Sequence, residues 1–245
     1  MKRLYGDIVR LLCMGLLGGV FSACSPTDVD RTVLDDEFRQ LVSCMEAGLD
    51  VEGRGYAVGK RIAELADDGE RRRCLEAFGR LVLSRETGGV DDGLLGKRAG
   101  RRRDLLSPYL YAAERCGVSF TERMGFRMAF VKWLRDEGKR RVSADVSENA
   151  GRASGLHWTE GMYLGHLAQL EFVCLRELER AFVDRMAGRD IPTDEISRLR
   201  PRLEAFLGHP VRTLSEIDRA YPVEWERLMR KVKDLERRGV QRTES

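Results

Sequence analysis

Cysteine offers the widest range of chemistry in this sequence, and its spacing limits what it can do. The six cysteines lie far apart along the 245-residue chain, which therefore has no Cys-x-x-Cys unit. This spacing counts against a redox motif, a zinc knuckle and a covalent haem site. Cys44, Cys74, Cys116 and Cys174 lie in the body of the chain. The sequence leaves open whether these four form disulfides or remain unpaired thiols in a hydrophobic core.

Histidine is the second residue type that could support catalysis or metal binding. The chain has three, His157, His166 and His209. His157 and Glu160 can share one face of a helix, but His166 falls on the opposite face. The sequence contains neither the His-Glu-x-x-His unit of zinc proteases nor the Glu-x-x-His unit of di-iron proteins. We therefore predict no catalytic residue, no metal ligand and no cofactor.

The N-terminal segment has the order of an exported leader. A basic start at residues 2–3 precedes an apolar run over residues 11–21, and small residues then precede Cys24. A transmembrane helix needs about 20 apolar residues, so this shorter run is typical of a cleaved signal peptide. We predict a signal peptide over residues 1–23.

The end of this segment, Phe21-Ser22-Ala23-Cys24, resembles the lipobox of bacterial lipoproteins. In that family, small residues precede a cysteine that receives diacylglycerol and becomes the new N-terminus after cleavage. The resemblance implies that Cys24 is lipidated, with Phe21 standing where the family usually has leucine. Ser25 after the cysteine resembles the signal that sorts lipoproteins to the outer rather than the inner membrane. No motif in the rest of the chain resembles a known family.

A cluster of arginines is the other candidate for specific binding. It consists of Arg98, Arg101, Arg102 and Arg103, and guanidinium groups bind phosphate, sulfate or carboxylate in bidentate fashion. In an alternative hypothesis, this cluster binds an anionic polymer or lipid of the envelope. Nearby acidic residues favour an ordinary solvated surface instead. A net charge of only +3 argues against nucleic acid as a partner.

Hydrophobic periodicity predicts helices along most of the chain after residue 30. The strongest stripe comprises Leu167, Leu170, Cys174 and Leu178, spaced as on one face of a helix. Strand signals are nearly absent, because no alternating run is bounded by turn residues. We predict an all-α fold of about seven or eight helices in antiparallel hairpins, either a bundle or a short helical array.

Two capping boxes of the S/T-x-x-E type predict where helices begin. In such a box, each side chain pairs with a backbone N–H that the first helical turn leaves without a partner. Ser119 with Glu122 predicts a helix start near residue 120, and Thr213 with Glu216 predicts one near residue 214.

A break in the helical pattern indicates how the chain is divided. Residues 139–156 contain few large apolar side chains and two glycines, so we predict a loop or linker there. The predicted organisation is a signal peptide at 1–23, a lipidated N-terminus and tether at 24–31, an N-terminal helical part at 32–138, the loop at 139–156, a C-terminal helical part at 157–240 and a disordered tail at 241–245.

These features together predict a membrane-anchored envelope lipoprotein of bacteria that is not an enzyme and that docks a protein partner. We expect contact with the membrane through the lipid on Cys24, with the outer membrane favoured over the inner one. A chain that is 42% hydrophobic and 34% charged is typical of a folded domain rather than a disordered or multi-span membrane protein. The sequence indicates neither the identity of the partner nor the oligomeric state.

Overall fold

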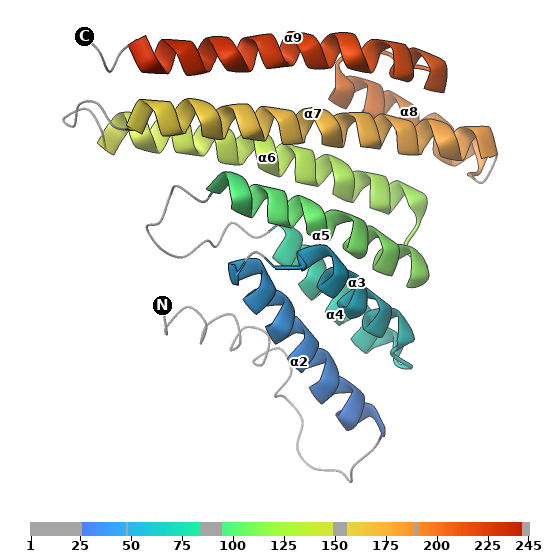
Figure 1. Ribbon diagram of the computed structural model, residues 1–245. Coiled ribbons are helices and arrows are strands. Elements are labelled where there is room, and N and C mark those ends of the chain that lie inside the picture. The colour runs from blue at the N-terminus through green and yellow to red at the C-terminus, as the bar shows by residue number, and fades with distance from the viewer. Residues whose placement is uncertain (1–25, 48, 84–94, 149–155, 189–190, 242–245) are drawn as a thin grey trace. The chain divides into compact units, whose positions relative to one another are not determined.

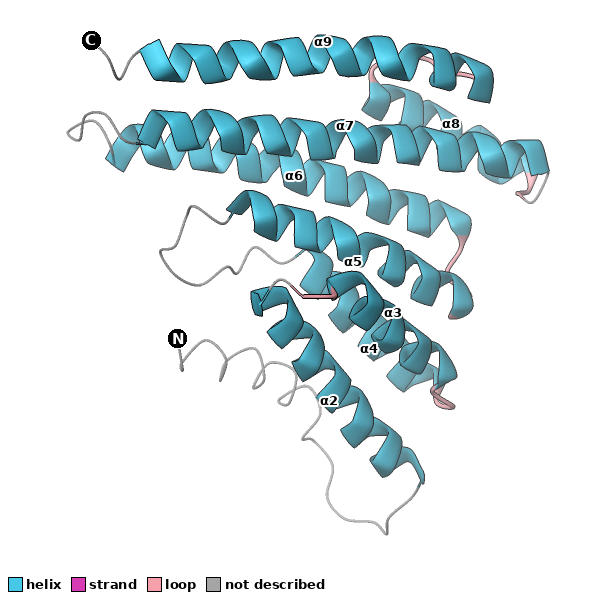
Figure 2. Cartoon of the chain, viewed as in Figure 1, coloured by secondary structure: helices cyan, strands magenta, loops and turns pink. Residues whose placement is uncertain are grey.

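The computed structural model describes residues 26–47, 49–83, 95–148, 156–188 and 191–241, and helices account for nearly all of them (Figures 1 and 2). These helices are α2 (Pro26–Ala47), α3 (Val51–Glu64), α4 (Asp68–Leu83), α5 (Leu95–Arg115), α6 (Phe120–Glu148), α7 (Leu156–Gly188), α8 (Thr193–Leu207) and α9 (Leu214–Gln241). No strand occurs within the described ranges. The predicted all-α fold of seven or eight helices is therefore confirmed.

The described residues fall into two compact units. Unit 1 contains α2, α3, α4 and the part of α5 from Arg101 onward, and it ends at Val118. Unit 2 contains residues 95–100 and everything from Ser119 onward. The predicted division at residues 139–156 is wrong. The boundary instead follows α5, where Gly117 adopts a positive φ of 77° that favours glycine and ends a helix.

Unit 1 is built around aromatic rings and one close helix contact. Phe78 of α4 is fully buried, and its ring centroid lies 6.1 Å from that of Phe38 on α2 and 5.9 Å from that of Tyr109 on α5. Gly55 lets α3 approach α5 closely, since a Cβ at this position would lie only 2.9 Å from Cγ of Pro108. A larger residue at Gly55 would force these two helices apart.

Unit 2 contains α7 and α9 side by side in opposite directions (Figure 1). A Cβ at Gly165 near the start of α7 would meet Val232 near the end of α9, whereas Arg180 late in α7 pairs with Asp218 early in α9. The buried core of this unit consists of Met124, Leu178, Phe182, Val183, Leu199, Leu203 and Ile217. It therefore joins α6, α7, α8 and α9 around one cluster.

Both predicted capping boxes are present. In the first, the backbone N–H and the hydroxyl of Ser119 donate to Oε2 of Glu122 over 3.1 and 2.7 Å. In the second, the backbone N–H and the hydroxyl of Thr213 donate to Oε2 of Glu216 over 2.7 and 2.8 Å. α6 and α9 begin directly after these capping residues, as predicted.

α6 is longer than predicted. It continues to Glu148, so the prediction of a loop is wrong for residues 139–148. These ten residues contain neither proline nor glycine, and a helix that has already formed gains one hydrogen bond for each residue it adds. A shortage of large apolar side chains limits core packing but does not end a helix.

The N-terminal segment also differs from the prediction where it is described. α2 begins at Pro26, so the predicted tether at 24–31 is helical from its third residue onward. The predicted signal peptide and Cys24 lie outside the described residues, as does most of the predicted tail, residues 242–245.

Candidate functional site

Two members of the arginine cluster bind neighbouring helices. Nη1 of Arg101 donates a hydrogen bond to the carbonyl oxygen of Met45 on α2, and Nη1 of Arg102 donates one to that of Leu81 on α4. Arg102 is only 6% exposed. These guanidinium groups therefore hold α5 within unit 1, and binding of an external anion by the cluster stays a prediction.

The other members of the cluster are Arg98 and Arg103. The side chain of Arg98 lies outside the described part of the chain. Arg103 is half-buried and lowers the pKa of Asp104, but burial of that carboxyl has the larger effect and raises its pKa above the usual value. The structure therefore does not bring all four arginines into one described surface.

The two histidines whose side chains are described, His166 and His209, lie in different parts of unit 2. The side chain of His157, like that of Glu160, is outside the described residues, and His166 is exposed on α7. His209 lies in the connection between α8 and α9, where it lines a pocket. No group of three or more potential metal ligands occurs among the side chains that the structure describes.

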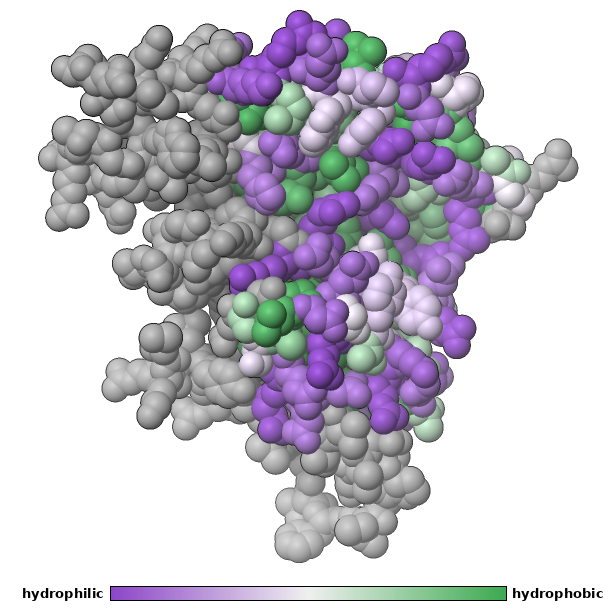
Figure 3. Space-filling view, viewed as in Figure 1, coloured by the Kyte–Doolittle hydropathy of each residue, from purple (hydrophilic) through white to green (hydrophobic). Residues whose placement is uncertain are grey.

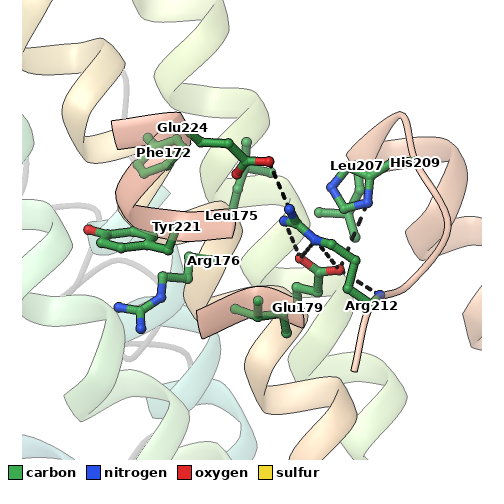
Figure 4. A pocket seen from close by; sticks show the side chains of 10 residues that line it. Phe172, Leu175, Arg176, Glu179, Leu207, His209, Arg212, Tyr221 and Glu224 are labelled. Carbon is green, nitrogen blue, oxygen red and sulfur yellow. Dashed lines mark hydrogen bonds and ion pairs between the residues drawn. The ribbon is translucent and has the colours of Figure 1, made fainter. Parts of the chain in front are cut away.

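The pocket around His209 is the candidate functional site (Figure 4). It lies in unit 2, between α7, α9 and the segment that joins α8 to α9, and has a volume of about 70 Å³. The residues that line it are Phe172, Leu175, Arg176, Glu179, Leu207, His209, Arg212, Ile217, Tyr221 and Glu224. Pockets for drug-sized ligands have volumes of roughly 300 to 1,000 Å³, so this one accommodates a small group only.

A buried ion pair dominates the chemistry of the pocket. Glu179 of α7 is 1% exposed, and its Oε2 accepts hydrogen bonds from Nη2 and Nε of Arg212 over 2.8 and 3.2 Å. Its Oε1 accepts the backbone N–H of Arg212 over 2.9 Å. Both carboxylate oxygens are therefore satisfied by one residue, which ties the α8–α9 connection to α7.

Arg212 also joins a second carboxylate. Its Nη1 donates to Oε1 of Glu224 on α9 over 2.8 Å. The hydrogen bonds from Arg212 to Glu179 are the main reason that the pKa of Arg212 lies above its ordinary value. Arg212 is therefore a permanent cation between two acidic side chains, as Figure 4 shows.

His209 borders this ion pair without joining it closely. Its Nδ1 lies 2.8 Å from the carbonyl oxygen of Pro210, and 3.9 Å from Oε1 of Glu179. A general base needs a lone pair within reach of a substrate proton. The carboxylate of Glu179 is already engaged by Arg212, so the arrangement favours a structural role over acid–base catalysis.

Aromatic rings form another wall of the pocket. Phe172 of α7 stacks on Tyr221 of α9 with ring centroids 5.1 Å apart, and Trp225 packs near both rings, with its centroid 5.6 Å from that of Phe172 and 6.1 Å from that of Tyr221. The guanidinium carbon of Arg176 lies 3.9 Å from the centroid of the Tyr221 ring, which is a cation–π contact. In Figure 3, hydrophilic side chains dominate the outer surface of α9 and hydrophobic ones lie toward α7.

His209 stands out in the sequence as one of three histidines, whereas Glu179 and Arg212 were not predicted as site residues. One signal was present, because Glu179 stands among the apolar residues Leu175, Phe182 and Val183 at helical spacings of three and four. A carboxylate at such a position is buried and needs a cationic partner. Nothing local identifies that partner, which is 33 residues away in the chain.

No disulfide joins the four cysteines that the structure describes, Cys44, Cys74, Cys116 and Cys174. Cys174 is buried at 3% exposure, while Cys44, Cys74 and Cys116 are half-buried. Burial raises the pKa of the Cys116 thiol, and the positive charge of Arg71 opposes this effect. Of the two possibilities that the sequence left open, these four positions therefore carry thiols and not disulfides.

Comparisons with known proteins give no family. No protein-family model matches the sequence, and no curated protein or solved structure matches it either. None of the described helices combines the length and hydropathy needed to cross a bilayer.

Proposed function

We propose that the chain is a lipid-anchored protein of the bacterial envelope whose helical body docks a protein partner and catalyses no reaction. The observation that carries this proposal is the order of a basic start, a short apolar run and Ser22-Ala23-Cys24. A segment of this kind directs export and provides a cysteine for lipidation. The outer membrane is the proposed location, because serine follows the cysteine.

The described start of α2 affects how such an anchor would hold the protein. An extended residue spans at most about 3.6 Å, and α2 begins at Pro26, two residues after Cys24. The first helix would therefore start within about 7 Å of the lipidated residue. Each buried CH₂ of an acyl chain contributes about 0.8 kcal/mol, so several chains would hold unit 1 firmly at the membrane surface.

The contents of the pocket support docking rather than catalysis. The buried carboxylate of Glu179 is neutralised by Arg212, and the pocket admits only a small group. Tyr221, Arg176 and Arg212 line the pocket, and tyrosine and arginine are enriched at the centres of protein interfaces.

Acyl-chain labelling tests the anchor directly. Cells that express the wild-type chain, Cys24→Ala or Cys13→Ala are grown with a labelled palmitate, and their inner and outer membranes are separated by density. We expect label and membrane association for wild type and for Cys13→Ala, which removes the other N-terminal cysteine, and neither for Cys24→Ala. A wild-type chain without label would refute the proposal, and labelled protein in the inner membrane would refute the location.

A further inference from the structure

An apolar stripe of α7 continues past the end of α8. Leu164, Ala168, Leu175 and Phe182 lie within about 40° of one another around the helix axis. Phe182 is buried in the core that α8 helps to form, and Leu175 lines the pocket beside Leu207, the last residue of α8. Leu164 and Ala168, two to three turns earlier, are half-exposed. The stripe is thus covered by α8 at one end only.

Two basic residues of α9 flank this stripe. Arg227 and Lys231 follow Glu224 by three and seven residues, which places all three on one face of α9. Glu224 binds Arg212 in the pocket, so this face lies on the pocket side of unit 2. Because α7 and α9 are antiparallel, the pairing of Gly165 with Val232 brings Arg227 and Lys231 level with the half-exposed part of the stripe.

A third basic residue lies on the α6 side. Lys132 is one turn from Met128, which packs on the core next to α8. It is also one turn from Arg135, whose guanidinium lies 5.0 Å from the centroid of the Phe206 ring on α8. This spacing places Lys132, which is exposed, on the side of α6 that faces α8. The Arg135–Glu171 pair sets Lys132 level with Cys174 of α7, so it lies beside the end of α8.

Two carboxylates near these residues pair with other side chains. Glu224 pairs with Arg212 over 2.8 Å, and Glu171 pairs with Arg135 over 2.5 Å. In the ranges that the structure describes, no salt bridge involves the exposed side chains of Lys132, Arg227 and Lys231. Positive charge from Arg227 and Lys231 therefore flanks the half-exposed part of the apolar stripe on its α9 side.

We propose that this surface docks an acidic amphipathic helix of a protein partner. We call it the basic face, defined by Leu164, Ala168, Leu175, Arg227 and Lys231. A helix laid along the stripe would bury its apolar residues beyond the end of α8 and place carboxylates opposite the two cations of α9. This inference rests on the proposed function and specifies the surface and the charge of the partner.

The test uses two labelled helical peptides of about 18 residues, or five turns. Both carry leucine along one stripe, and the remaining positions carry mainly glutamate in one peptide and mainly lysine in the other. Binding to the full chain in neutral detergent micelles is measured by fluorescence anisotropy. We expect the glutamate peptide to bind at least about tenfold more tightly than the lysine peptide, with an affinity that falls as salt is added.

Charge reversal locates the binding surface. The double variant Arg227→Glu/Lys231→Glu should weaken the glutamate peptide at least about tenfold. The matched control is Arg219→Glu/Lys233→Glu, because these exposed residues lie on other faces of the same helix, and its affinity should stay within about threefold of wild type. Circular dichroism checks that both variants keep the helical content of the wild type.

Several results would overturn the inference. These are failure of the glutamate peptide to bind, equal binding of both peptides, and equal weakening by the two double variants. A fourth is that the chain binds vesicles of anionic lipid more tightly than the glutamate peptide and that this binding also depends on Arg227 and Lys231. The palmitate experiment is read separately. Absence of palmitate label would refute the anchor but leave these affinities unchanged, and absence of peptide binding would leave the labelling of Cys24 unchanged.

Discussion

Removal of the Arg212 side chain should destabilise unit 2 more than removal of an exposed arginine of α9. In Arg212→Ala, the carboxylate of Glu179, which is 1% exposed in the wild type, loses the three hydrogen bonds that Nε and Nη2 of Arg212 donate to it. A buried charge without its partner costs far more than a broken surface pair.

The expected magnitude follows from the burial of Glu179 and from what remains in the variant. Breaking a buried ion pair by removing one partner costs about 3 to 5 kcal/mol. The loss in free energy of unfolding should lie at the low end of this range, about 3 kcal/mol, for two reasons. The Arg212 side chain is 23% exposed, so water can reach the site, and the backbone N–H of residue 212 still donates to Glu179.

Urea unfolding followed by circular dichroism and tryptophan fluorescence provides the measurement. The matched control is Arg230→Ala, because the Arg230–Glu226 pair is 71% and 72% exposed and should contribute about 0 to 1 kcal/mol. The double variant Glu179→Gln/Arg212→Ala should recover part of the loss, since no buried charge remains. Equal costs for Arg212→Ala and Arg230→Ala, at an unchanged m value, would show that the buried pair does not stabilise the unit.

The remaining predictions concern helix contacts and caps. Gly165→Ala should lower the free energy of unfolding in urea by about 1 to 3 kcal/mol, because the new Cβ would lie 2.6 Å from Cγ1 of Val232. The control is Gly125→Ala, whose Cβ would meet nothing within 4 Å and which should be neutral or stabilising by up to about 1 kcal/mol. Equal effects of the two variants would contradict the close contact at Gly165. Thr213→Ala should cost about 1 kcal/mol at pH 7. The backbone N–H of Thr213, which the variant keeps, and then its hydroxyl lower the pKa of Glu216. Only the share of the cost that comes from the hydroxyl bond to the carboxylate is therefore present above the unfolded pKa of about 4.3 and lost as the pH falls through the lowered folded pKa. The cost should be smaller at pH 2 than at pH 7, and equal costs would refute this link.

The helices could be predicted from the sequence because their signals are local. The stripe of Leu167, Leu170, Cys174 and Leu178 is buried along its whole length, as its spacing predicts. The division into units has no comparable local signal, because no long segment poor in apolar residues marks it. The boundary after α5 is instead a short turn at Gly117, between a helix end and a capping box.

The pocket could be predicted only in part, for a related reason. Hydrophobic spacing shows that Glu179 lies on the inner side of α7, and it shows that Tyr221 and Trp225 share a face of α9. The position of Arg212 depends on how α8 ends and reverses direction at Gly208, whose φ is 79°. That geometry is set by tertiary packing, so spacing along the chain does not determine which carboxylate Arg212 reaches.

Backbone hydrogen bonds explain why the connection between α8 and α9 can hold this pocket in one shape. Three consecutive N–H groups, those of Val211, Arg212 and Thr213, donate over 3.1, 2.9 and 2.7 Å to glutamates from three different helices, Glu204 of α8, Glu179 of α7 and Glu216 of α9. Each buried or half-buried donor must find an acceptor, and here each acceptor also fixes one helix to the connection. Glu204 and Glu216 are near the connection in sequence. Of the three glutamates, only Glu179 is buried, and only its hydrogen bond reaches a helix outside the α8–α9 pair. The ion pair of Glu179 with Arg212 should therefore control the stability of the whole site.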